Sequence, residues 1–190
     1  MFEVFAQYLR KNALLTDTEI EQFHARAAVK KLRKRQYLLQ EGDVCHHNCF
    51  VAAGCLRLYR VGDRGTEHIL KFAVENWWIG DYESYNAGTP AKNNIDALED
   101  SELILIKKTD LDELVSTIPN FRNFKERLDT RSFDASQNRI LSSISDSAEK
   151  RYENFVKTYP NVFNRVLLHM IASYLGVTRE TLSRVRNNYA

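Results

Sequence analysis

The stretch from Leu168 to Arg186, Leu-His-Met-Ile-Ala-Ser-Tyr-Leu-Gly-Val-Thr-Arg-Glu-Thr-Leu-Ser-Arg-Val-Arg, constrains the fold of this chain more than any other feature. Its pattern predicts two short helices joined by a tight turn. Ile171, Ala172 and Leu175 would share one face of the first helix, and Gly176 follows where the turn needs a residue that tolerates positive φ. Such a pair is typical of the helix-turn-helix, whose second helix enters the DNA major groove.

The second helix of this pair has both a start signal and a buried stripe. Thr178 is well placed as its N-cap, since a threonine hydroxyl accepts a hydrogen bond from a free N–H of the first turn. Leu182, Val185 and Tyr189 recur at steps of three and four, which predicts the face that packs on the first helix.

The opposite face of the second helix is polar and supplies the candidate DNA contacts. Arginine forms a bidentate pair with guanine O6 and N7, and glutamate accepts a hydrogen bond from cytosine N4. We therefore expect G·C pairs to be read there. The alternative is an ordinary solvated helix hairpin, because arginine and glutamate decorate many surface helices. The predicted DNA-binding residues are Thr178, Arg179, Glu180, Thr181, Ser183, Arg184 and Asn187.

The order of segments along the whole chain carries a resemblance. Strand-like segments are followed by a long helical stretch and then by Thr-Arg-Glu-Thr-Leu-Ser-Arg. This order resembles the Crp/Fnr family of transcriptional regulators. The resemblance implies that Arg179, Glu180 and Arg184 make base contacts, and that a homodimer binds double-stranded DNA at a palindromic site. It also makes RNA polymerase a candidate partner. Members of this family usually have a wing strand after the recognition helix. The given sequence ends at Ala190, so we expect fewer contacts with DNA phosphates.

The expected fold class is α+β: an antiparallel β-roll like the cyclic-nucleotide-binding jelly roll, with flanking helices, a long dimerisation helix and a helix-turn-helix domain. We place the sensor domain at 1–118, the dimerisation helix and hinge at 119–145, and the DNA-binding domain at 146–190. Short segments that alternate between apolar and polar residues and are separated by glycine turns support the roll. Residues 56–61 are the clearest such strand, and 63–67 would close a hairpin.

Other segments complete this expected architecture. Thr16 and Glu19 form a capping box. Strands are expected at 29–39, 50–53, 68–74 and 95–107, and a helix at 110–118, capped by Thr109 and ended by Pro119. The basic run in 29–39 is either a nucleic-acid patch or, as we expect, the solvated face of an outer strand.

A helical stretch without glycine or proline runs from Asn120 to about Tyr159. Its apolar stripe needs a partner, which is either the same helix of a second subunit, as the resemblance implies, or the chain's own β-roll. Ser142 to Ser147 is a plausible hinge. The stripe consists of Phe121, Phe124, Leu128, Ala135, Leu141 and Ile144.

Residues 77–98 decide whether a cyclic nucleotide is an effector. The resemblance implies Gly-Glu followed by Arg-Ser or Arg-Thr, with the arginine holding the cyclic phosphate. Here Gly80-Asp81 is followed by Lys92-Asn93-Asn94-Ile95-Asp96, without arginine. A phosphate needs a bidentate cation, and Asp96 would repel it. We expect no cyclic nucleotide, although Lys92 could substitute for the arginine.

Whether an unknown small molecule acts as an effector stays open. Its degenerate pocket would involve Gly80, Asp81, Lys92, Asn94 and Ile95. Four aromatic residues either line such a pocket or, as we expect, belong to the core: Trp77, Trp78, Tyr82 and Tyr85. The alternative function is therefore a small-molecule or cyclic-nucleotide sensing module with a vestigial DNA-binding domain.

Cys45, Cys49 and Cys55 lie near His46 and His47, which raises zinc or iron as a possibility. Some Fnr-like members carry an iron–sulfur cluster. The chain has no fourth cysteine and no C-x-x-C pair. We therefore expect reduced, partly buried thiols, no zinc and no iron–sulfur cluster.

Charge and composition narrow the remaining classes. The net charge is +2, yet residues 164–190 carry four arginines against one glutamate, so positive charge is local to the predicted motif. The N-terminus resembles neither a signal peptide nor a membrane span, and we expect a cytoplasmic protein without a membrane partner. No phosphate-binding loop, H-E-x-x-H or nucleophile elbow occurs, so we expect no enzyme.

Overall fold

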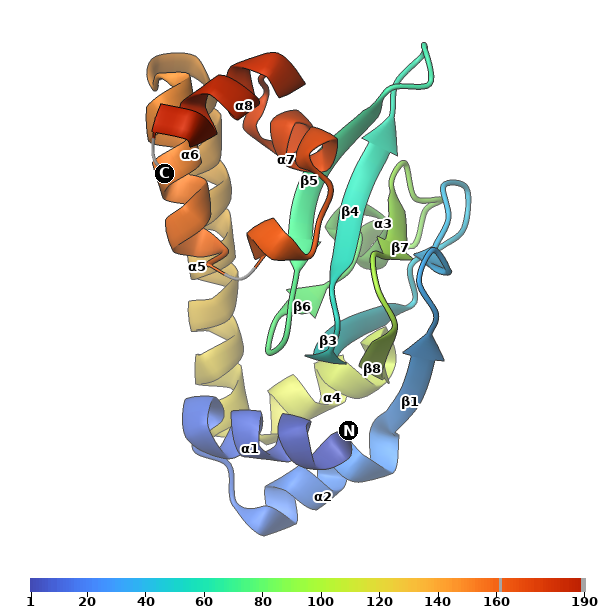
Figure 1. Ribbon diagram of the computed structural model, residues 1–190. Coiled ribbons are helices and arrows are strands. Elements are labelled where there is room, and N and C mark those ends of the chain that lie inside the picture. Colours follow the sequence, from blue (N-terminus) through green and yellow to red (C-terminus); the bar gives the residue numbers. More distant parts are fainter. Residues whose placement is uncertain (161, 189–190) are drawn as a thin grey trace.

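The computed structural model describes residues 1–160 and 162–188. It consists of two four-stranded antiparallel sheets with helices packed on their outer faces (Figure 1). The strands are β1 (Ala27–Leu32), β2 (Tyr37–Leu39), β3 (His47–Ala53), β4 (Leu56–Val61), β5 (Glu67–Ala73), β6 (Trp78–Ile79), β7 (Asn94–Ala97) and β8 (Ser101–Lys107). The helices are α1 (Phe2–Ala13), α2 (Asp17–Arg26), α3 (Tyr82–Ala87), α4 (Lys108–Thr117), α5 (Pro119–Ser145), α6 (Ala148–Thr158), α7 (Leu168–Leu175) and α8 (Arg179–Asn188).

The two sheets face each other and form the predicted β-roll. One sheet has the strand order β1-β8-β3-β6 and the other the order β2-β7-β4-β5. Small and aliphatic side chains from both sheets fill the space between them, among them Val51, Leu56, Ile95 and Leu103. The expected α+β architecture with an antiparallel roll is confirmed.

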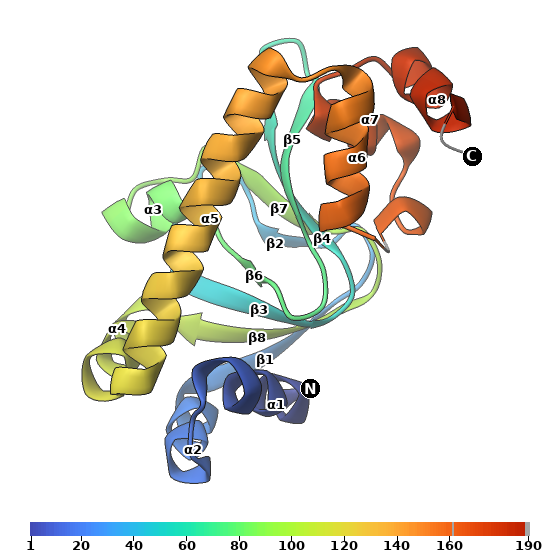
Figure 2. The ribbon, with the colours of Figure 1, turned by 90° about the vertical axis from the view of Figure 1, so that its left-hand side faces the viewer.

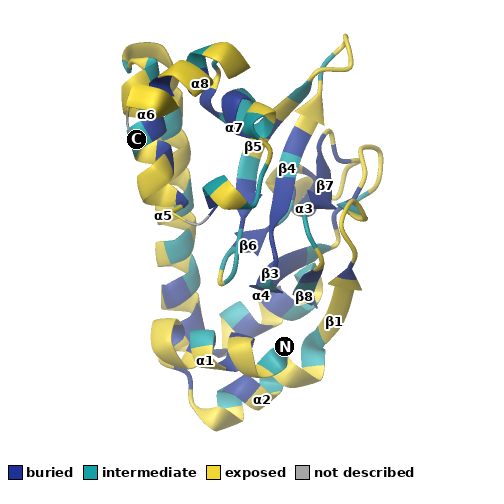
Figure 3. Ribbon diagram, viewed as in Figure 1, coloured by how far each residue is buried: buried dark blue, intermediate teal, exposed yellow. Residues whose placement is uncertain are grey.

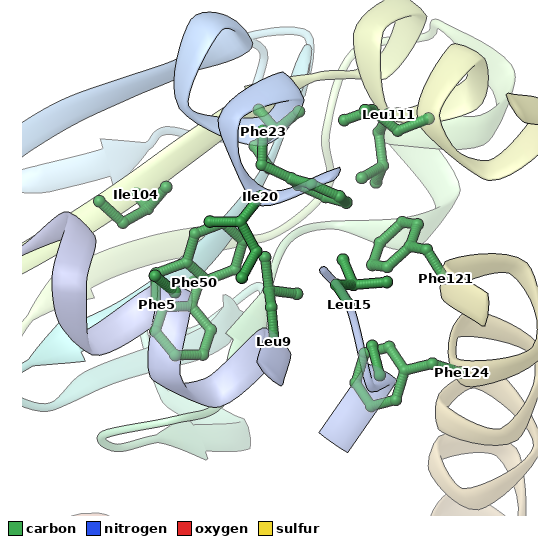
Figure 4. Close-up of a cluster of buried hydrophobic side chains, with 14 of the residues drawn as sticks. Phe5, Leu9, Leu15, Ile20, Phe23, Phe50, Ile104, Leu111, Phe121 and Phe124 are labelled. Carbon is green, nitrogen blue, oxygen red and sulfur yellow. The ribbon is translucent and has the colours of Figure 1, made fainter. Parts of the chain in front are cut away.

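The N-terminal helices α1 and α2, with α4 and the start of α5, cover the outer face of the first sheet. Phe5 and Phe23 come from α1 and α2, Phe50 from β3, and Phe121 from the start of α5, and all four are fully buried (Figure 4). Burying a side chain of this size contributes about 1.5–3 kcal/mol. The capping box of Thr16 and Glu19 starts α2 as predicted.

The C-terminal helices cover the outer face of the second sheet. Ile69 and Phe72 of β5 pack in one cluster with side chains of α6, α7 and α8. In Figures 1 and 2, α5 runs along the side of the roll and links the N-terminal helices to this C-terminal group. The C-terminal helices are thus seated on the sheet and do not project from it.

Two of the expected strands are each divided into two shorter strands, which belong to different sheets. Residues 29–39 contain β1 and β2, separated by a turn at 34–35, and residues 95–107 contain β7 and β8, separated at 98–100. The continuous apolar and basic pattern hid these corners, where the chain crosses between sheets. The hairpin at 63–67 is confirmed, with Val61 paired to Glu67.

The helical expectations also need correction. Asp146 and Ser147 interrupt the stretch from 120 to 159, and Ser147 caps α6 by accepting a hydrogen bond from the Lys150 N–H. This break lies inside the segment expected to be a hinge. Thr109 is not a cap, because α4 already begins at Lys108 with Lys107 as its N-cap. Pro119 does end α4, but it also occupies the first turn of α5, where its missing N–H costs nothing.

Candidate nucleic-acid interface

A tight turn joins α7 to α8. Gly176 has φ 65 and ψ 38, and its N–H is directed to the carbonyl oxygens of Ala172 and Ser173. The Val177 N–H follows with a hydrogen bond of 3.1 Å to the Ala172 oxygen. Residues other than glycine rarely adopt this left-handed conformation, so the glycine sets the angle at which α8 leaves α7.

The two helices are held together as the sequence predicted. Ile171, Ala172 and Leu175 are buried on α7, and Leu182 and Val185 are buried on α8. Tyr189, the third member of the predicted stripe, lies outside the described residues. The helix pair therefore shares one apolar contact and turns its other faces outward.

Thr178 caps α8. Its hydroxyl oxygen accepts a hydrogen bond of 3.1 Å from the Thr181 N–H, and the Thr178 hydroxyl lies 3.0 Å from the Thr181 hydroxyl. Both threonines were predicted to face DNA, and both are partly engaged in starting the helix. Thr178 is exposed and Thr181 is half-buried.

The remaining predicted contact residues lie together on the outer side of α8. Arg179, Glu180, Ser183, Arg184 and Asn187 are all exposed. They line a single open hollow on the surface, which Leu168 and Asn188 complete. Within the described ranges, none of these five side chains forms a hydrogen bond or ion pair, so their polar groups are available to a partner.

Two further features set the charge on this surface. Hydrogen bonds with its own backbone and with Ser147, and then the charge of Arg184, lower the pKa of the Glu149 carboxyl on α6. Arg186 faces elsewhere, because its guanidinium lies 5.2 Å from the centre of the Phe163 ring. Arg186 therefore adds local charge without sharing the hollow with Arg179.

The residues proposed for an effector pocket are placed very differently. Asp81 is 2% exposed and caps α3 by accepting a hydrogen bond of 3.0 Å from the Ser84 N–H. Its second oxygen accepts from the Asn93 amide at 2.8 Å. Both oxygens of this carboxylate are therefore occupied by the chain itself.

The other members of that proposed pocket do not converge. Asn94 is buried and its Oδ1 accepts a hydrogen bond of 3.0 Å from the Glu41 N–H, while Ile95 packs inside the roll. Lys92 is exposed and forms an ion pair with Glu83 at the surface. Gly80 lies beside β3 at the end of β6, with the His47 oxygen 3.7 Å from where a Cβ would lie.

The four aromatic residues are also dispersed. Trp78 packs on the helical side of the first sheet, Tyr85 lies inside the roll, and Trp77 packs in the C-terminal cluster as well as against the roll. Tyr82 is 40% exposed on α3. Three of them belong to the core, as expected, and they do not line a common pocket.

Arg57 is the polar residue of the roll that sequence reasoning missed. Its guanidinium donates to both oxygens of Asp96, from Nε at 2.8 Å and from Nη2 at 2.9 Å, and to both oxygens of Glu67. Burial alone would lower the pKa of Arg57, but the hydrogen bonds that it donates to Asp96 and Glu67 outweigh this effect and raise the pKa above its ordinary value. The polar position in the alternating strand 56–61 was visible, but its partners became apparent only with the pairing of β4 with β7 and β5.

The buried charged groups of the roll do not fit a cyclic phosphate. Such a ligand needs a free cationic fork, and the buried arginine of the roll already holds two carboxylates. Asp81 and Asp96 add negative charge in the same region. Two exposed cations lie at the edge of this region: Arg60 donates from Nε to the Asn93 Oδ1 at 3.0 Å, and Lys92 pairs with Glu83.

The three cysteines are free thiols and all are buried. Burial raises the pKa of Cys45 and Cys49, and raises that of Cys55 to about 12. Within residues 1–160 and 162–188, no group of three or more histidine, cysteine or acidic side chains is arranged to hold a metal ion.

The second half of α5 is largely exposed (Figure 3), and several of its exposed side chains are apolar. Phe121 and Phe124 of the predicted stripe are buried on the chain's own core, whereas Ala135, Leu141 and Ile144 are exposed. Two further members of this exposed face, Phe133 and Ile140, were absent from the predicted stripe. Leu141, Ile144, Phe133 and Ile140 are 61%, 79%, 63% and 56% exposed. None of the helices in the described part of the chain has the length and apolar composition to cross a membrane.

Comparison by sequence finds a family model and curated proteins that this chain resembles. Residues 29–117 match the family model of the cyclic nucleotide-binding domain. Electron transport regulator A of Shewanella oneidensis is 27% identical over 171 residues, which cover 84% of this chain and 68% of that protein. The fumarate and nitrate reduction regulatory protein of Escherichia coli is 26% identical over the same shares of the two chains.

Solved structures share the fold at low sequence identity. FixK2 from Bradyrhizobium japonicum superposes with a TM-score of 0.72 at 18% identity, over 85% of this chain and 83% of that chain. A regulator from Eubacterium rectale, described as a putative member of the crp/fnr family, gives a TM-score of 0.70 at 18% identity, over 96% and 87%.

Proposed function

Because the chain belongs to the Crp/Fnr family of transcriptional regulators, we propose that it regulates transcription by binding a palindromic duplex DNA site as a homodimer. The reading element is α8. The observation that carries the proposal is the outer side of α8, where five polar side chains are exposed and none is used by the described part of the chain.

The chemistry of these side chains suits base recognition. Arg179 and Arg184 each offer a bidentate donor pair for guanine, and Glu180 offers an acceptor for cytosine. Arg179 and Glu180 stand at the N-terminal end of α8, which is the end that approaches base edges in this motif. The expected half-sites contain G·C pairs.

The exposed face of α5 supports the homodimer. Phe133, Ile140 and Ile144 are spaced by seven and four residues, so they lie on one side of the helix. The same helix of a second subunit covers such a face in a two-fold arrangement. Two recognition helices would then meet successive major grooves, about 34 Å apart.

The regulator we propose is not controlled by cyclic AMP and has no zinc or iron–sulfur cofactor. The reason for the first part is the internal pairing of Asp81, Asp96 and Arg57, which occupies the buried arginine of the roll and leaves two carboxylates where a cyclic phosphate would need positive charge. Any effector would be of another chemical class.

The test begins with selection of bound sequences from a random duplex library. We expect a palindrome with G·C pairs in each half and binding that weakens as salt rises. Arg179→Ala should then lower affinity for the selected site about 5- to 150-fold, corresponding to about 1–3 kcal/mol, with a smaller loss on random duplex.

Arg186→Ala is the matched control, because it removes the same charge from the same helix but from the side that packs on Phe163. It should affect selected and random duplexes alike. Equal losses on both duplexes for Arg179→Ala would contradict base reading. Saturable calorimetric binding of cyclic AMP or cyclic GMP, without salt-dependent duplex binding, would favour the sensing-module alternative.

A further inference from the structure

The strand β5 has a free edge, and the C-terminal helices occupy it. β5 is the last strand of its sheet, so one row of its backbone groups has no strand partner. The Ile69 N–H donates to the Ser173 hydroxyl oxygen at 3.0 Å, and the Ser173 hydroxyl donates to the Glu67 oxygen at 2.8 Å. A single serine of α7 thus replaces part of a missing strand.

Arg139 of α5 completes this contact. Its Nη2 donates to the Ile69 oxygen and to the Tyr174 oxygen, both at 3.0 Å, and its Nη1 donates to the Leu70 oxygen. The guanidinium also lies 4.0 Å from the centre of the Tyr174 ring. Among the described residues of α5, only Arg139 hydrogen-bonds both β5 and α7.

Other contacts attach the C-terminal helices to the roll without involving α5. Arg165 pairs with Glu75 and Glu99, and Phe72 of β5 contacts the rings of Phe155 and Tyr159. These contacts seat the helices on the sheet. They do not reach the second half of α5, where Arg139, among the described residues, provides the hydrogen bond to α7.

The chain connection alone does not fix the direction of α5 relative to α8. α5 ends at Ser145, and Asp146 and Ser147 are extended before α6 begins. Two such residues can absorb large changes in backbone angle between rigid helices. Non-covalent contacts must therefore determine where α8 stands relative to α5.

We propose that Arg139 is a positioning residue that fixes α8 relative to α5 and thereby sets the half-site spacing that the dimer accepts. This inference rests on the proposed function, because it assumes that α5 forms the dimer and α8 reads DNA. Arg139 is next to Ile140 of the exposed apolar face, so the same turn of α5 would contact the second subunit and hold β5 and α7 through Arg139. The planar guanidinium extends from α5 and holds carbonyl groups of both β5 and α7, so it permits little rotation of α5 relative to these two elements.

The test measures how strongly the full chain discriminates between half-site spacings. Adding one base pair to the selected palindrome moves a half-site by about 3.4 Å and turns it by about 35°. We expect the wild type to bind the altered site about tenfold more weakly or worse. In Arg139→Met this discrimination should fall to about threefold or less, because the two recognition helices can then adjust independently.

Two further measurements separate positioning from folding. Hydrogen exchange at the Ile69 amide reports undocking of α7, since its acceptor Ser173 is unchanged in Arg139→Met, and we expect it to rise about tenfold. Arg139→Lys keeps the charge but not the fork, and should also relax spacing discrimination. Arg33→Met removes an exposed charge from the turn between β1 and β2 and should change neither quantity.

Each outcome has a definite meaning. Relaxed spacing together with faster Ile69 exchange supports the inference. Unchanged spacing discrimination in Arg139→Met, or an equal loss of affinity on every duplex, overturns it while leaving the proposed function intact. Absence of duplex binding by the wild type overturns the proposed function and the spacing role with it.

Discussion

The region around Asp81 and Arg57 in the roll and the outer side of α8 contain similar residue types in opposite states. Around Asp81 and Arg57, each carboxylate is paired with a group of the same chain. On α8, Arg179 and Glu180 point into an open hollow and have no partner among the described residues. Buried polar groups that are fully satisfied serve the fold, whereas exposed and unsatisfied ones are free to bind.

This difference separates polar groups that the fold uses from polar groups that it leaves free. A roll stabilised by its own ion pairs does not need a ligand to complete it. The helix α8, by contrast, gains nothing from its outer polar residues within the described chain. The two regions should therefore respond differently to the same kind of mutation.

The largest effect is expected at Arg57. Arg57→Met leaves Asp96, whose side chain is 9% exposed, without its cation, and stranding a buried charge costs about 3–5 kcal/mol. Urea unfolding should show this loss. The double variant Arg57→Met/Asp96→Asn should recover part of it, and Lys92→Met, at the exposed pair with Glu83, should change stability by less than about 1 kcal/mol.

The contrast between the two regions fails if Arg57→Met is as stable as the wild type. An Arg57 that can be removed without cost would be available to a ligand. Arg179→Ala, for comparison, should leave the free energy of unfolding within about 0.5 kcal/mol of the wild type, since it is an exposed surface change.

A smaller effect is expected at Asp81. Asp81→Ala removes the cap of α3 and leaves the Asn93 amide without its acceptor, which should cost about 1–3 kcal/mol. Glu83→Ala, on the exposed side of the same helix, is the control and should cost less than about 1 kcal/mol. Both unfolding and duplex binding should be measured, and a loss of sequence-specific binding without a loss of stability in Asp81→Ala would assign this carboxylate a signalling role instead.

The sequence predicted those features that depend on neighbouring residues. The turn at Gly176, the cap at Thr178 and the buried stripe of α7 and α8 each follow from residues within one helical turn of each other. The hairpin at 63–67 has the same local origin. Patterns of this kind need no knowledge of the rest of the chain.

Features that depend on distant segments escaped prediction. The pair between Arg57 and Asp96 joins positions 39 residues apart, and the contact between Arg139 and Ile69 joins positions 70 apart. The corners that divide 29–39 and 95–107 also depend on which sheet accepts each strand. Local composition carries no record of such pairings, and they became visible only in the folded chain.

The smallest effect concerns the buried thiols of the roll and appears only in alkaline solution. The pKa of Cys55 is raised to about 12 by burial, whereas an unfolded cysteine ionises near 8.5. Above that pH the unfolded chain loses a proton that the native chain keeps, so Cys55 lowers stability as pH rises, by at most about 1.4 kcal/mol per pH unit. Cys55→Ser removes this contribution, while the opposing contribution of Lys71, whose pKa is lowered to about 8, is the same in both proteins.

The difference in unfolding free energy between wild type and Cys55→Ser should therefore stay constant from pH 6 to 8 and shift in favour of the serine variant above about pH 9. A difference that is flat up to pH 10 would mean that the Cys55 thiol ionises in the folded chain, so that this part of the roll is open to water like the face of α8.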